Sequence, residues 1–246
     1  MKRYILPLLL PLLLSCATTM VWAFDPSLYQ TTLTNVKGTT AQIEDRNTPV
    51  GSSGIVLHAF DKEHRAIIAT AIVKSKSDGK ATLVFKKFKR LEQPSLPEYK
   101  IAPKNGDIVI LNYLYNRILP IMPDEKHFKT FLKTHAEFET IHPDLFAADL
   151  YLGHDPQPTR RDFQQVCRQN DLGLLYFAVK NHGYYVDCDS FKILDSEPLK
   201  QAIDTPKSMH PFYHRLPKIK NRMGGIMGSE SIGDYNLYYQ TLLGLK

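Results

Sequence analysis

A two-residue alternation of apolar and polar positions runs from Gly51 to about Met122 and predicts β-structure. Two turn signals, Asp78-Gly79 and Asn105-Gly106, interrupt it. We expect residues 51–122 to form a small β-barrel or sandwich, because closing a sheet limits its unpaired edges. Residues 24–50 are expected to be an extended lead-in. The candidate strands are IVLHAF (55–60), AIIATAIV (66–73), ATLVFKKF (81–88) and DIVILNYLY (107–115).

After Pro123 the apolar period lengthens towards 3.6 residues, which predicts helices. Helix starts are expected at Asp124, at Pro143-Asp144 and at Thr159, because these residue types cap or open helices. The apolar faces of the three helices are expected to contain, in order, His127, Phe128, Phe131 and Leu132; Leu145, Phe146 and Leu150; and Phe163, Val166 and Cys167.

The third helix leads into two strand-like runs, LLYFAV (174–179) and YYVDC (184–188), joined by a turn at 181–183. Residues 123–195 therefore predict an α/β unit of helices and a β-hairpin. We expect residues 196–246 to form a low-order segment followed by a short amphipathic helix. The fold class is α+β. The terminal helix is indicated by apolar residues at Tyr235, Tyr238, Tyr239, Leu242 and Leu243.

The first residues have the form of an export signal. Lys2 and Arg3 precede an apolar run at 5–14 that is too short to span a bilayer, and VWA at 21–23 fits signal peptidase. We therefore interpret residues 1–23 as a signal peptide. An alternative lipobox ends at Cys16, which would then be lipidated, and only in that case is membrane association expected.

Charge and motifs exclude several functions. The net charge is +6, and removing Lys2 and Arg3 leaves 29 basic and 25 acidic residues, or +4, which does not demand nucleic acid. The basic stretch KKFKR (86–90) is interpreted as a solvated face. His210 and His214 are separated by a segment with Pro211, which disfavours a shared metal. No phosphate-binding loop or nucleophile elbow is found, so we expect no catalytic residue, metal or cofactor.

Cys167 and Cys188 are the two cysteines downstream of the predicted signal. An oxidising compartment favours a disulfide between them. The alternative is a pair of buried thiols.

Eight segments together resemble the N-terminal domain of the PgbA-type plasminogen-binding proteins of certain Gram-negative bacteria. This resemblance implies an exported protein at or near the cell surface that captures host plasminogen. It also places Cys167 and Cys188 on the family's cysteine positions. The segments are QPSLP (93–97), NGDIVIL (105–111), YNRILPIMP (115–123), HPDLFAADL (142–150), PTRRDFQQVC (158–167), GLLYF (173–177), DCDSFKIL (187–194) and PFYHR (211–215).

The kringle modules of plasminogen recognise a C-terminal lysine through its ammonium and carboxylate groups, with aromatic side chains around the cation. Lys246 offers both groups, and Lys218 and Lys220 are further candidates. The alternative function is a structural or docking module of the periplasm or outer membrane that packs against other envelope proteins.

Overall fold

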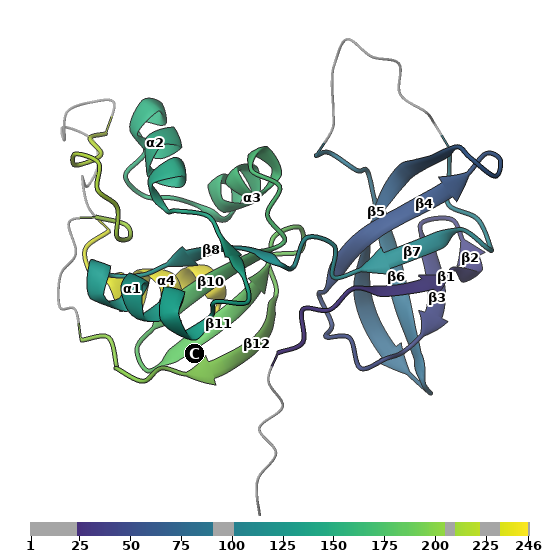
Figure 1. Ribbon diagram of the computed structural model, residues 1–246, viewed down its shortest axis with the longest axis horizontal. Coiled ribbons are helices and arrows are strands. Elements are labelled where there is room, and N and C mark those ends of the chain that lie inside the picture. Colours follow the sequence, from purple (N-terminus) through teal and green to yellow (C-terminus); the bar gives the residue numbers. More distant parts are fainter. Residues whose placement is uncertain (1–23, 91–100, 205–209, 222–231, 246) are drawn as a thin grey trace, which may run out of the picture.

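The computed structural model describes residues 24–90, 101–204, 210–221 and 232–245. Figure 1 shows two lobes side by side, each built on its own β-sheet. The predicted α+β class, with a β-rich first part and a C-terminal helix, is confirmed. The predicted signal peptide, with Cys16, and Lys246 lie outside the described residues.

The first lobe is a curled antiparallel sheet of seven strands in the order β1-β7-β4-β5-β6-β3-β2. Inward-facing side chains such as Leu33, Val56 and Leu83 fill its core, because alternate residues of each strand point to the same face. The strands are β1 Tyr29–Thr32, β2 Thr34–Lys37, β3 Thr40–Glu44, β4 Ser53–Ala59, β5 Arg65–Ser77, β6 Lys80–Lys86 and β7 Ile108–Leu111.

The segment expected as a lead-in, 24–50, contributes β1, β2 and β3 to this sheet. These strands are only four or five residues long, and β1 and β2 are largely exposed, so their alternation is weak in the sequence. The ends of the sheet approach each other, since the Tyr29 hydroxyl donates to the carbonyl oxygen of Glu44 at 2.8 Å. The predicted turn between β5 and β6 is present, with φ of +51° at Asp78 and +71° at Gly79.

The second lobe holds a mixed sheet of five strands in the order β12-β11-β10-β8-β9. Strands β10, β11 and β12 are antiparallel, whereas β8 runs parallel to both β9 and β10. β8 therefore belongs to this sheet, although its residues fall inside the predicted 51–122 unit. The strands are β8 Arg117–Ile121, β9 Glu139–Thr140, β10 Leu174–Val179, β11 His182–Asp187 and β12 Ile193–Pro198.

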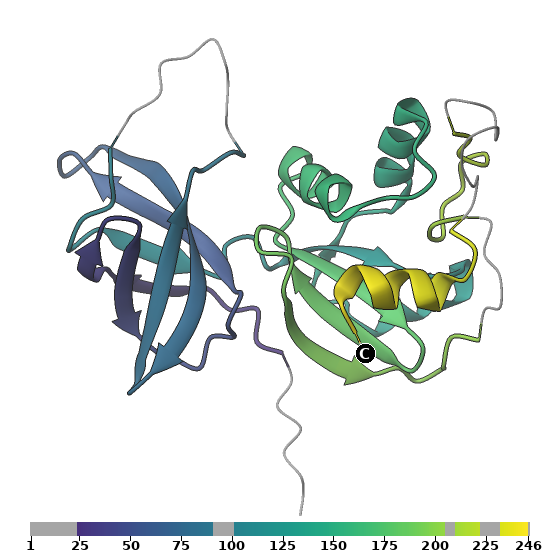
Figure 2. The same ribbon diagram turned by 180° about the vertical axis from the view of Figure 1, so that it is seen from behind.

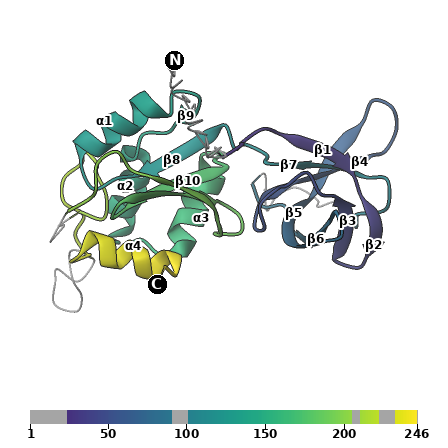
Figure 3. The ribbon, with the colours of Figure 1, turned by 90° about the horizontal axis from the view of Figure 1, so that it is seen from below.

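Helices cover both faces of the second sheet, which explains why every residue of β10 is buried. Figure 3 shows α1 on one face and α4 on the other, and Figure 2 shows α4 lying across the strands. The predicted cap at Asp124 and the capping box of Thr159 with Asp162 are present. The helices are α1 Glu125–Thr134, α2 Asp144–Gly153, α3 Arg160–Gln169 and α4 Tyr235–Leu243.

Two residues predicted on apolar helix faces are exposed. Leu132 of α1 is 40% exposed and Leu145 of α2 is 50% exposed. In α1 the sheet covers only a narrow stripe that contains Phe128 and Phe131, and Leu132 falls beside it. In α2 apolar residues occupy most of the helix, so the sequence does not distinguish the face that packs inwards.

The lobes are joined through a buried cluster of hydrogen bonds. Ser53 of β4 donates its hydroxyl to Asp187 at the end of β11, and the Tyr115 hydroxyl donates to the same carboxylate oxygen at 2.8 Å. Nearby, the Arg90 guanidinium, whose side chain is 4% exposed, donates to the carbonyl oxygens of Cys167 and Leu172. These contacts attach the first lobe directly to the second sheet.

Candidate functional site

Helix α1 presents lysines on the side opposite its buried face. Phe128 and Phe131 pack inwards, while Lys126, Lys129 and Lys133 are exposed. Spacings of three and four residues place these lysines on neighbouring turns. Lys133 also lies in the last turn, where the helix dipole favours a positive charge.

Together with Glu125 and Thr130, these lysines line one depression, which we call the lysine face. Lys129 forms an ion pair with Glu125, with 2.8 Å between Nζ and Oε1, and this hydrogen bond raises the pKa of the Lys129 ammonium. In the described parts of the chain, Lys126 and Lys133 form no ion pair. The lysine face therefore carries three ammonium groups against one carboxylate.

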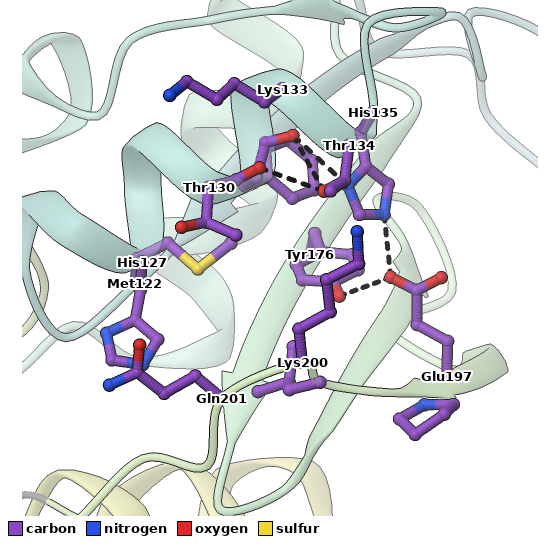
Figure 4. Close-up of a pocket in the computed structure, with 13 residues that line it drawn as sticks. Met122, His127, Thr130, Lys133, Thr134, His135, Tyr176, Glu197, Lys200 and Gln201 are labelled. Atoms are coloured by element: carbon purple, nitrogen blue, oxygen red, sulfur yellow. Dashed lines mark hydrogen bonds and ion pairs between the residues drawn. The ribbon is translucent and has the colours of Figure 1, made fainter.

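A pocket of about 410 Å³ lies beside the lysine face, between α1 and the end of β12 (Figure 4). Thr130 and Lys133 border both features. The other residues that line the pocket are Met122, His127, Phe131, Thr134, His135, Tyr176, Glu197, Pro198, Leu199, Lys200 and Gln201.

Glu197 is the centre of the pocket's polar network. His135 Nε2 lies 2.7 Å from Glu197 Oε1, and the Tyr176 hydroxyl donates to the same oxygen at 2.6 Å. Burial opposes ionisation of Glu197, but these hydrogen bonds outweigh it and lower the pKa of the carboxyl. Glu197 is therefore a charged carboxylate at neutral pH.

The register of three strands positions this network. Gly183 of β11 pairs with both Ala178 of β10 and Glu197 of β12. A Cβ atom on Gly183 would lie 1.7 Å from the Tyr176 hydroxyl oxygen, so the Tyr176 side chain crosses β11 over this glycine. Burial and the contact with Glu197 raise the pKa of Tyr176 far above its ordinary value, which keeps the hydroxyl a neutral donor.

His135 is the C-cap residue of α1, and its ring is held by one contact on its face and another at one ring nitrogen. Its imidazole stacks on Phe131 with centroids 4.2 Å apart, and Thr134 Oγ1 lies 2.8 Å from Nδ1. The ring nitrogen that faces Glu197 is thus fixed in direction before any ligand enters.

The sequence did not single out this pocket. Glu197 falls at the start of the segment expected to have little order, and its contact with Tyr176 depends on strand register. The one signal available was the histidine directly after the predicted first helix, because a histidine near a helix C-terminus can hydrogen-bond the last carbonyl groups of the helix.

The residues singled out from the sequence lie elsewhere. Cys167 of α3 and Cys188 after β11 form a disulfide, as expected for an oxidising compartment. The rings of His210 and His214 are 4.7 Å apart, on the segment that follows the second sheet. Of the two further lysine candidates, Lys220 is exposed and Lys218 is partly buried.

Two findings concern metal sites and membrane-spanning helices among the described residues. They contain no group of three or more His, Cys, Asp and Glu side chains suited to a metal ion. None of their helices has the length and apolar character required to cross a membrane.

The sequence of the chain is similar to a family named for plasminogen binding. The chain matches the family described as "Plasminogen-binding protein pgbA N-terminal" over residues 28–243, and it belongs to this family.

Its relatives include the plasminogen-binding protein PgbA of Helicobacter pylori strain J99 / ATCC 700824. That protein is 25% identical over 195 residues, which cover 79% of this chain and 42% of the relative. The protein of the same name from strain ATCC 700392 / 26695 is 24% identical over the same shares. The chain thus spans about two fifths of the length of the curated relatives that it matches.

Proposed function

We propose that this chain is an exported, non-catalytic protein of the bacterial envelope that captures plasminogen by presenting lysine to its kringle modules. The observation that carries the proposal is the family match over residues 28–243, together with relatives named for plasminogen binding. The place of action is the cell surface or outer membrane, with the periplasm as the alternative.

The lysine face of α1 supplies suitable chemistry within the described residues. A kringle pocket binds the ammonium group of its ligand among aromatic side chains, and it binds the carboxylate group of the same ligand at a neighbouring position. Lys126, Lys129 and Lys133 present ammonium groups on one rigid helix, and Glu125 adds a carboxylate that is paired with Lys129 at 2.8 Å. Lys246 is the second candidate, as predicted from the sequence.

Binding of the purified protein to immobilised kringle modules tests both lysine candidates. We expect 6-aminohexanoate to compete, because it carries the same two charged groups as lysine. Replacing Lys126, Lys129 and Lys133 with alanine should weaken binding at least tenfold, which corresponds to about 1.4 kcal/mol. Removing Lys246 measures the second contribution separately.

A matched control replaces three exposed lysines of the first lobe, Lys62, Lys74 and Lys80, with alanine. This variant loses the same charge and should bind kringles as the unmodified protein does. Equal losses in both triple variants would reduce the interaction to general electrostatics. Full binding after the α1 substitutions and removal of Lys246 would refute lysine presentation by these sites.

The location requires separate experiments. Mass spectrometry of the mature N-terminus distinguishes cleavage before Phe24 from lipidation at Cys16. Protease treatment of intact cells should degrade a surface-exposed protein. Complete protection in intact cells, with degradation after the outer membrane is opened, would favour the periplasmic structural module and exclude contact with a host ligand.

A further inference from the structure

The pocket between α1 and β12 combines an apolar wall with charged groups of both signs. Met122, Phe131 and Tyr176 are each at most 3% exposed and form the apolar wall. Its volume of about 410 Å³ falls within the range of small-molecule sites, roughly 300 to 1,000 Å³. These dimensions suit a ligand of the size of an amino acid.

Glu197 supplies the negative group, and 38% of its side chain remains exposed. The hydrogen bonds from His135 and Tyr176 both end on Oε1. The Tyr185 hydroxyl is a further hydrogen-bonding neighbour of this carboxylate and also favours its charged form. A carboxylate fixed in this way recognises a ligand ammonium group without having to reorganise.

Lys200 supplies the positive group. In Figure 4 its side chain extends from the end of β12 towards His135 and Glu197. Neither Lys200 nor Lys133 has an ion-pair partner in the parts of the chain that the structure describes. The Lys200 ammonium group is therefore available to a ligand carboxylate, whereas the Lys133 side chain points away from Glu197 (Figure 4).

We propose that this pocket binds a free α-amino acid with an apolar side chain. The ligand ammonium group contacts the Glu197 carboxylate, its carboxylate contacts Lys200, and its side chain packs on Met122, Phe131 and Tyr176. This arrangement uses both charges of the pocket and its apolar wall together. A ligand with only a negative charge would be repelled by Glu197, and a ligand with only a positive charge would leave Lys200 without a partner.

Calorimetric titration of the purified protein with L-phenylalanine and three analogues tests the proposal. We expect phenylalanine to bind more tightly than 3-phenylpropionate, which lacks the ammonium group, and 2-phenylethylamine, which lacks the carboxylate. Glycine, which lacks the apolar side chain, should bind more weakly as well. Each missing group should weaken binding roughly tenfold or more.

Two substitutions assign the charges. In Glu197→Gln the amide oxygen can still accept from His135 and Tyr176, but the preference for phenylalanine over 3-phenylpropionate should disappear. In Lys200→Met the preference over 2-phenylethylamine should disappear, and this exposed residue can be changed without disturbing the core. Lys62→Met, at an exposed position of the first lobe and outside the pocket, should leave the affinities for phenylalanine and its analogues unchanged.

No binding of phenylalanine by the folded protein would overturn the proposal. Equal affinities for 3-phenylpropionate and 2-phenylethylamine in the unmodified protein, in Glu197→Gln and in Lys200→Met would also overturn it. The proposal does not rest on plasminogen capture, because Glu197 and Lys200 lie outside the lysine face. Loss of amino acid binding in Lys200→Met with kringle binding retained would separate the two activities.

Discussion

Ser53 and Asp187 are 134 positions apart in the chain, yet the Ser53 hydroxyl donates a hydrogen bond to Asp187 Oδ2 across the junction of the two lobes. The Tyr115 hydroxyl donates to the same oxygen and accepts from the backbone N–H of Ser53. The backbone N–H groups of Asp189 and Ser190 donate to Oδ1. Asp187 is fully buried, so the stability of this junction depends on the charge of its carboxyl.

The first prediction concerns pH. Burial, with repulsion from Asp189 as a smaller cause, raises the pKa of Asp187 from 3.8 to about 6. The folded state therefore holds this proton more tightly than the unfolded state. Its stabilising contribution is fully present below pH 3.8 and is lost as the pH rises through 6. The difference corresponds to about 3 kcal/mol.

Urea unfolding of the protein and of Asp187→Asn at pH 4, 5, 6 and 7 measures this effect. The free energy of unfolding of Asp187→Asn, relative to that of the unmodified protein, should rise by about 2 kcal/mol between pH 4 and pH 7. Asp204→Asn, at an exposed position, is the matched control and should show no such change. A constant difference for Asp187→Asn across this range would contradict the prediction.

The second prediction concerns the Tyr115 hydroxyl. Tyr115→Phe removes the donor to Asp187 and the acceptor for Ser53 in a fully buried place. Leaving buried polar groups unpaired should lower the free energy of unfolding by about 1–3 kcal/mol. Tyr113→Phe, at a partly buried position, should change it by less than about 0.5 kcal/mol. Equal effects of the two substitutions would show that the junction contributes little.

The third prediction concerns the disulfide between Cys167 and Cys188, which are 21 positions apart. Closing a loop of this length restricts the unfolded chain and should stabilise the fold by about 3 kcal/mol. Unfolding with and without reductant measures this contribution. The Cys167→Ser, Cys188→Ser double variant should be less stable and insensitive to reductant. A reductant effect that persists in the double variant would assign it to another cause.

The fourth prediction concerns Gly183. A methyl group there would collide with the Tyr176 hydroxyl, so Gly183→Ala must displace Tyr176 from Glu197. We expect a loss of about 1–3 kcal/mol in stability and weaker binding of ligands in the pocket. Gly153→Ala is the control, because a Cβ there meets no atom within 4 Å and the residue is helical. Unchanged stability in Gly183→Ala would mean that Tyr176 is not held in place.

The sequence predicts local features of this fold well, because their causes are local. The helix starts at Asp124 and Thr159 follow from capping chemistry, and the turn at Asp78-Gly79 follows from the φ values that these residues tolerate. The disulfide follows from the small number of cysteines and the expected compartment. None of these inferences requires knowledge of which strands are neighbours.

The features that escaped prediction depend on pairing between distant segments. Strand β8 follows directly on the first sheet in the sequence but pairs with β10, which lies beyond three helices. Glu197 is the next-to-last residue of β12, a strand that is polar at several positions. It becomes part of a pocket only through its register with Gly183. A single sequence contains no local signal for such pairings.

The parallel pairing of β8 with β10 also has a consequence for the order of folding. The hairpins of β10, β11 and β12 join neighbouring segments and close short loops, so they can form early. β8 can join them only after the chain has returned through α1, α2 and α3, which is a slower, long-range step. We infer that the attachment of β8 is the slow, long-range step in forming the second sheet.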